Sequence, residues 1–399
     1  MTAQTKASWF CRLKPVHYAA LALLGCEASP SNQEPLWDET TAWTIGSEKL
    51  RIGADEAQDG HSLFRVRTAI DHPDGRIIVL NGGSNEVRVF DSDGVLIRSF
   101  GGTGQGPEQF SALAAMWLVA NDTVVTYDVG QARLLAWPLA DGSPVPIALD
   151  VSQRPTIHGR FDSGSYLIGH IDQPQRREAG SRWVDSVNLV VAPTSVGTPN
   201  HVARFPHVAM FAAPSPGGRG GSILTPLGYS GNASIAVGQS EFYYGFGQNW
   251  IIARYEESGI VSDTIRRHES PKQFTGAMLT ALIDERVAMV PPDQAPVMRN
   301  FIEAFPWPET MAAFQGLQLD ELGCLWAQHT VPPGAEHSTW SVFSARGRWL
   351  GEVLIPSNFR PTRFGGQSLL GVQTGEDGVE NVVVYEIVKP EPSVDCTSD

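Results

Sequence analysis

Residues 64–100 contain four short apolar or alternating runs separated by turn sequences rich in Asp, Asn and Gly. Runs of this length and pattern predict β-strands. Four antiparallel strands in about 40 residues form one blade of a β-propeller, which cannot bury both of its faces alone and must stack on neighbours. The chain is therefore predicted to be a ring of such blades.

The same pattern returns along the chain. Paired runs precede turn signals in residues 123–142, 165–197, 241–259 and 324–347. A last pair, residues 368–372 and 380–387, lacks an outermost strand, which the otherwise isolated run 42–52 can supply. Closure of this kind leaves no open sheet edge. The sequence thus predicts an all-β, six-bladed propeller over residues 42–389, a monomer whose N-terminal strand closes the last blade.

The longest insertion, about residues 273–306, carries a helical pattern. Apolar residues repeat at three- and four-residue intervals in two runs separated by Pro291 and Pro292. Two short amphipathic helices are expected, either buried for packing alone or offering an apolar side to a partner.

Several motifs resemble those of the NHL-type six-bladed propeller proteins of bacterial envelopes. They are residues 74–79, 87–91, 101–110, 340–351 and 379–385. The resemblance implies the fold but no single activity. Enzymes of the gluconolactonase and virginiamycin B lyase types share this fold and place acids, amides or histidines around the central channel. No motif here carries those residues over.

The N-terminus has the features of a secretory signal. Basic residues precede an apolar run over residues 16–24, and Leu23-Leu24-Gly25-Cys26 resembles a bacterial lipobox. This predicts a signal peptide at 1–25, lipidation of Cys26 and a linker at 26–41. The mature protein would then lie in the bacterial cell envelope, on the periplasmic or outer-membrane face, held to the membrane by lipid alone.

Net charge bears on the partners that the protein could bind, and cysteine content bears on its disulfides. The net charge is −14, and removal of residues 1–25, with three basic and no acidic residues, makes it −17. Such a surface repels nucleic acid. Cys324 and Cys396 either remain free or pair in an oxidising compartment. Residues 390–399 are expected to be a flexible tail.

The predicted loops differ in length between the two sides of the ring. Connections after the first and third strands of each blade are tight turns, whereas the other side carries the long segments. These are residues 101–109, 170–182, 204–232, 267–313 and 329–338. We call this side the long-loop face. Long loops on a rigid scaffold commonly bind ligands, so a binding surface is expected there.

Candidate residues for that surface follow from their predicted places. They are Arg65, Arg67, Gln105, His170, Trp183, Trp307, His329 and Arg363. The arginines either pair with nearby carboxylates or bind an anion at the channel mouth. The two tryptophans lie at loop ends and could contact peptide or carbohydrate. An envelope protein, peptide or glycan is the expected partner.

Recognisable catalytic motifs do not occur. The glycine loop 101–107 lacks the Gly-Lys-Ser/Thr ending of a phosphate loop, and neither metal-ligand spacings nor Gly-x-Ser-x-Gly is present. No cofactor and no metal are expected, and catalytic residues are not identified. A binding or scaffold module is favoured; the alternative is a lactonase-like hydrolase or a lyase with a site at the central channel.

Overall fold

The computed structural model describes residues 34–53, 62–119, 122–172, 177–194, 197–214, 222–391, 394 and 396. The predicted signal peptide and Cys26 lie outside these residues. Within them the strands form six antiparallel sheets, each of which is one blade. The prediction of a six-bladed propeller is confirmed.

Blades 1 to 3 follow one another along the chain. Blade 1 contains β2 (Val66–Asp71), β3 (Ile77–Asn81), β4 (Glu86–Phe90) and β5 (Leu96–Gly101). Blade 2 contains β6 (Leu113–Val119), β7 (Thr123–Asp128), β8 (Arg133–Pro138) and β9 (Val145–Ile147). Blade 3 has a fifth strand and contains β10 (Thr156–Arg160), β11 (Tyr166–Ile171), β12 (Arg182–Ala192), β13 (Asn200–Pro214) and β14 (Ser222–Pro226).

Blades 4 to 6 complete the ring. Blade 4 contains β15 (Ser234–Val237), β16 (Glu241–Gly245), β17 (Ile251–Glu256) and β18 (Val261–Arg266). Blade 5 contains β19 (Phe314–Leu319), β20 (Leu325–His329), β21 (His337–Phe343) and β22 (Trp349–Pro356). Blade 6 contains β23 (Phe359–Phe364), β24 (Ser368–Thr374), β25 (Glu380–Val388) and, from the other end of the chain, β1 (Thr44–Ile52).

The first strand of each blade is innermost, and side chains join these inner strands from blade to blade. Thr362 Oγ1 of β23 donates to the Ala69 carbonyl of β2 at 2.8 Å. Gln318 Nε2 of β19 donates to the Pro361 carbonyl at 3.2 Å. Such bonds satisfy polar groups where adjacent sheets meet and hold the blades in register.

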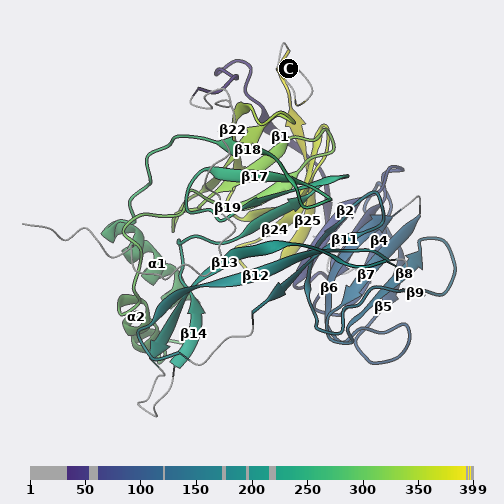
Figure 1. Ribbon diagram of the computed structural model, residues 1–399, viewed down its shortest axis with the longest axis horizontal. Coiled ribbons are helices and arrows are strands. Elements are labelled where there is room, and N and C mark those ends of the chain that lie inside the picture. The colour runs from purple at the N-terminus through teal and green to yellow at the C-terminus, as the bar shows by residue number, and fades with distance from the viewer. Residues whose placement is uncertain are drawn as a thin grey trace, which may run out of the picture.

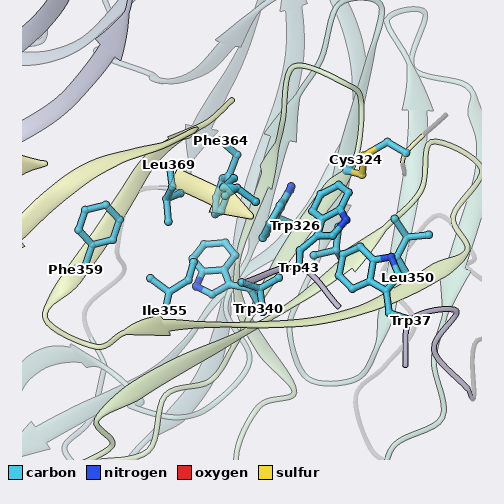
Figure 2. Packing of buried hydrophobic residues seen from close by; sticks show 14 of the residues in the cluster. Trp37, Trp43, Cys324, Trp326, Trp340, Leu350, Ile355, Phe359, Phe364 and Leu369 are labelled. Carbon is cyan, nitrogen blue, oxygen red and sulfur yellow. A yellow bond between two sulfur atoms is a disulfide. The ribbon is translucent and has the colours of Figure 1, made fainter. Parts of the chain in front are cut away.

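The N-terminal strand closes the ring as predicted. β1 pairs antiparallel with β25, from Thr44 opposite Val388 to Ile52 opposite Val382. Beside this junction the rings of Trp37 and Trp43 lie 4.7 Å apart, and Trp326 stacks 4.2 Å from Phe364 (Figure 2). The cluster buries aromatic surface from both chain ends between blades 5 and 6.

Described residues of both terminal segments are held against the propeller more firmly than the sequence suggests. Trp37, in the expected linker, is buried; its backbone N–H donates to the Leu350 carbonyl at 2.7 Å and its Nε1 to the Val394 carbonyl at 2.8 Å. Cys396, in the expected flexible tail, is buried and forms a disulfide with Cys324, with Cα atoms 5.1 Å apart. The tail is therefore fastened to blade 5 at this cysteine.

The helical insertion is present where it was expected. α1 (Gly276–Ala288) begins after Thr275, whose side chain accepts the Met278 N–H, and α2 (Ala295–Glu303) follows the proline pair. Figure 1 shows both helices beside β14 and the end of β13, away from blades 1 and 2. The structure differs from the expected long loop 204–232, because residues 204–214 belong to β13 and residues 222–226 form β14.

Trp37→Ala should lower the free energy of unfolding by about 3–5 kcal/mol, because it empties a large buried site at the ring closure. Urea denaturation measures this change. Leu36→Ala, at the exposed neighbouring residue, is the matched control and should have little effect. Equal losses in the two variants would show that residues before β1 do not support closure.

Candidate functional site

A cavity of about 260 Å³ opens on the long-loop face between blades 4 and 5. Its walls come from the end of β18, the segment that follows it, the β16–β17 loop, residues 311–313 and the start of the β20–β21 loop. The lining residues that matter most are Trp250, Arg266, Glu269, Lys272, Ala313 and Thr330.

The stem of the helical insertion forms one side of this cavity. The Met311 N–H donates to the Lys272 carbonyl at 2.8 Å, and the Phe274 N–H donates to the Glu309 carbonyl at 2.9 Å. These bonds join the two ends of the insertion into a short hairpin. Its position is fixed against blade 4, where the Ala313 N–H donates to the Gly247 carbonyl at 2.7 Å.

Arg267 forms a rigid wall of the cavity. Its guanidinium lies 3.7 Å from the centroid of the Trp349 ring and 5.1 Å from that of Trp250. It donates to Ser341 Oγ at 2.7 Å and to Glu352 Oε1 at 2.9 Å, and its side chain is only 9% exposed. Because its donors and charge already have partners, Arg267 holds the wall in place.

His329 packs behind the same wall, against Trp250 and Ser341. The sequence places it in a loop, but it is the buried last residue of β20, with Nε2 2.8 Å from Ser341 Oγ. Its ring packs edge-on against Trp250 at 4.8 Å. Burial, with Lys272 and Arg267 nearby, lowers the pKa of His329 to about 3, so the imidazole is neutral at pH 7. It packs inside blade 5 and is not among the residues that line the cavity.

Thr330 lines the cavity and has a buried hydroxyl without a partner among the described residues. The residue is 5% exposed, and within the described part of the chain its Oγ1 has no hydrogen-bond partner. Around the opening, Arg266, His268 and Lys272 add basic side chains that are exposed. Lys272 Nζ lies 3.9 Å from Glu269 Oε1, which is the limit of an ion pair. These residues were not singled out from the sequence, although residues 267–272 lie at the start of a segment expected on this face.

Trp307 joins the insertion to blade 3. Its ring stacks on Phe274 at 5.5 Å and lies 4.7 Å from Phe305, while Nε1 donates to the Ile302 carbonyl at 2.8 Å. Phe305 in turn packs edge-on against Phe211 of β13 at 5.5 Å. The ring thus serves packing within this module, and its predicted contact with a ligand stays a prediction.

Trp183 and His170 both lie in blade 3. Trp183 is the second residue of β12, next to the loop that joins β11 to β12. It donates from Nε1 to Asp185 Oδ1 at 2.5 Å and has the Arg177 guanidinium 5.1 Å from its ring. His170 is half-buried in β11 opposite Asn188. Neither residue lines the cavity between blades 4 and 5.

Gln105 is exposed at the tip of the glycine loop. Three glycine N–H groups of the loop have internal partners: Gly102 donates to the Asn85 carbonyl at 2.8 Å, Gly104 to the Phe110 carbonyl at 3.0 Å and Gly106 to Gln109 Oε1 at 3.1 Å. Amides with partners of this kind cannot cradle a phosphate, so the loop serves as a turn between blades 1 and 2.

The three predicted arginines divide between the two sides of the ring. Arg65 and Arg67 are exposed at the start of β2, on the long-loop face. Arg363 lies at the other end of the inner strands, where it pairs with Asp71 and with Glu321 at 2.7 Å. Arg363 therefore has the structural role that the sequence left open, and it does not belong to the long-loop face.

Side chains that could bind a metal ion gather away from the cavity between blades 4 and 5. Among the described residues, two clusters bring three His, Cys, Asp or Glu side chains together. One contains the disulfide cysteines with Asp320. The other contains His72, Asp74 and Asp122, and the Arg76 guanidinium already pairs with both of its carboxylates.

Comparison with known proteins supports the fold. The family model DUF5128, described as a 6-bladed beta-propeller, matches residues 61–175. No curated protein matches the chain in sequence. Neither of the two described helices is long and apolar enough to span a membrane.

Solved structures resemble the chain at low identity. A member of the DUF4221 family from Bacteroides vulgatus is 9% identical, with 88% of this chain and 100% of that chain covered and a TM-score of 0.51. The calcium-binding protein regucalcin from Agrobacterium tumefaciens is 12% identical, covering 87% and 96%, with a TM-score of 0.42. Virginiamycin B lyase from Staphylococcus aureus is 10% identical, covering 87% and 99%, with a TM-score of 0.40. Similarity at this level shows the propeller fold alone.

The buried His329 should make the protein less stable in acid. As pH falls below the ordinary histidine pKa of 6.5, the unfolded chain takes up a proton that the folded state, with a pKa of about 3, does not. The free energy of unfolding should then fall by up to about 1.4 kcal/mol per pH unit from this group between pH 6 and 4. Denaturant titrations of His329→Gln should show a correspondingly shallower slope, whereas His201→Gln, an exposed control, should keep the parent slope.

Proposed function

We propose that this protein is a lipid-anchored, extracytoplasmic β-propeller of NHL type that binds an envelope protein, peptide or glycan through its long-loop face. The observation that carries the proposal is the asymmetry of the ring. The long-loop face bears the helical insertion, the extension formed by β12, β13 and β14, and the cavity of about 260 Å³ between blades 4 and 5. The opposite side bears short turns at residues 72–76, 91–95, 257–260, 320–324 and 344–348. A more open hollow of about 690 Å³ lies on that opposite side, beside Glu241, Arg254 and Arg346.

The insertion and the blade 3 extension form one module. Phe305 and Trp307 pack against Phe211 and Leu227, so the two segments share a small apolar core of their own. A module held this way presents a fixed surface, which lowers the entropic cost of binding a partner. Its outer side carries Met289 and Val297, which are 72% and 63% exposed.

The anchor part of the proposal rests on the N-terminal sequence. Basic residues, an apolar run and a cysteine after Gly25 are the features that export and lipidation require. The Cys324–Cys396 disulfide fits a protein that folds in an oxidising compartment.

Cys26→Ser should move the protein from the membrane fraction to the soluble fraction, because only a thiol at the cleavage site can accept the lipid. Fractionation of cells followed by mass measurement of the mature protein tests this. Cys396→Ser, expected to fold less stably but to keep its anchor, is the matched control. Membrane retention of the Cys26→Ser protein would contradict the anchor.

Replacing Met289 and Val297 together by Ser should reduce capture of an envelope partner at least tenfold, since two apolar contacts would be lost from the module. The full chain, carried in detergent, is used to pull down proteins and glycans from envelope extracts. Val145→Ser with Leu354→Ser is the control, because both residues are similarly exposed but lie on outer strands. Equal loss in both double variants, or no loss in either, would place the binding surface elsewhere.

A further inference from the structure

We propose that the cavity between blades 4 and 5 binds a carboxylate attached to a small apolar group, as at the C-terminal end of a peptide. This inference rests on the proposed function, because it names the chemical group that a partner would insert into the long-loop face. The charge of the lining, a buried hydroxyl and an apolar wall each support it.

The lining is basic in a chain whose net charge is −14. Arg266, Arg267 and Lys272 line the cavity with one carboxylate, that of Glu269. Glu352, which lies behind the wall, pairs with Arg267 at 2.9 Å. Within the described part of the chain Arg266 has no ion-pair partner, and Lys272 has only the distant contact with Glu269. Two flexible cations at the opening are thus available to an anion.

The hydroxyl of Thr330 points to a ligand with an acceptor atom. A buried polar atom without a hydrogen bond is rare in folded proteins, and each case calls for an explanation such as a bound group. Thr330 is 95% buried and lines the cavity. Once a rotation of the side chain turns this hydroxyl toward the cavity, it would donate a hydrogen bond to one carboxylate oxygen of the ligand, while the second oxygen faces the cations of the rim.

The remaining wall is apolar and small. Trp250, Met311, Ala312 and Ala313 contribute it, and the volume of about 260 Å³ lies just below the usual range for small-molecule sites. It therefore suits one amino-acid side chain with its terminal carboxylate. The Trp250 ring is 5% exposed and partly covered by Arg267, so it offers no open aromatic face on which a sugar ring could stack.

Calorimetric titration of the intact protein with N-acetyl-leucine tests the inference, and N-acetyl-leucinamide is the uncharged control ligand. The acid should bind saturably and at least tenfold more tightly than the amide. Thr330→Val and Lys272→Gln should each weaken binding of the acid three- to tenfold. Arg346→Gln is the matched control, because it removes one exposed positive charge from the short-turn side and should leave the affinity unchanged.

The contrary outcomes are distinct. Equal affinity for acid and amide, or no saturable binding of the acid up to about 10 mM, would overturn the assignment. Should Thr330→Val fail to fold, the exposed variants Lys272→Gln and Arg266→Gln decide the same question, and unchanged affinity in both would overturn it. Tighter binding of glucuronate than of N-acetyl-leucine would overturn the peptide assignment in favour of an acidic glycan.

These results are separable from the test of the proposed function. The Met289 and Val297 substitutions leave the cavity residues intact. Loss of N-acetyl-leucine binding with partner capture retained would remove the cavity assignment alone. Retained binding of the acid by a protein that captures no partner would remove the partner-binding role alone.

Discussion

Closure of the ring within blade 6, where β1 pairs with β25, is the contact on which the rest of the structure depends. Without β1, the outer edge of β25 would have no strand to pair with, and an open edge invites association with other chains. Pairing alone does not hold the junction, because a single outer strand frays easily. The buried rings of Trp37, Trp43 and Trp326 pack beside this pairing. The Cys324–Cys396 disulfide holds the C-terminal end of the chain to blade 5 (Figure 2).

A closed ring can carry long insertions without losing its shape, since the blades supply the core and loop length costs little entropy. The chain uses this freedom on one side only. The insertion after β18 and the extension of blade 3 come from neighbouring blades and pack against each other through Phe305 and Trp307 (Figure 1). The cavity lies where the end of the insertion leads into blade 5. Because blades 4 and 5 supply part of its walls, these walls are held in place by the packed sheets.

Predictions at single residues succeeded less well than predictions of whole elements. His329 and Trp307 were candidates because polar or aromatic residues near loop ends are often exposed. Both are instead used by the protein itself, His329 beneath Trp250 and Trp307 between two segments of the insertion. A local pattern cannot reveal this in full, since Trp250, which packs on His329, and Phe274, which stacks on Trp307, are tens of residues away in sequence. Arg266, Lys272 and Thr330 were not predicted as site residues for the same reason. They line one cavity only because blades 4 and 5 pack side by side.

The sequence by itself determined the all-β class, the number of blades, the strand that closes the ring and the two helices of the insertion. Each depends on the spacing of apolar residues and turns within a short stretch, which is the information that a linear pattern holds. Only the tertiary structure decided that Trp37 and Cys396 are buried, that Arg363 faces the opposite side, and that a basic cavity exists. These features depend on which distant segments meet once the blades stack, and no periodicity within a segment encodes that contact.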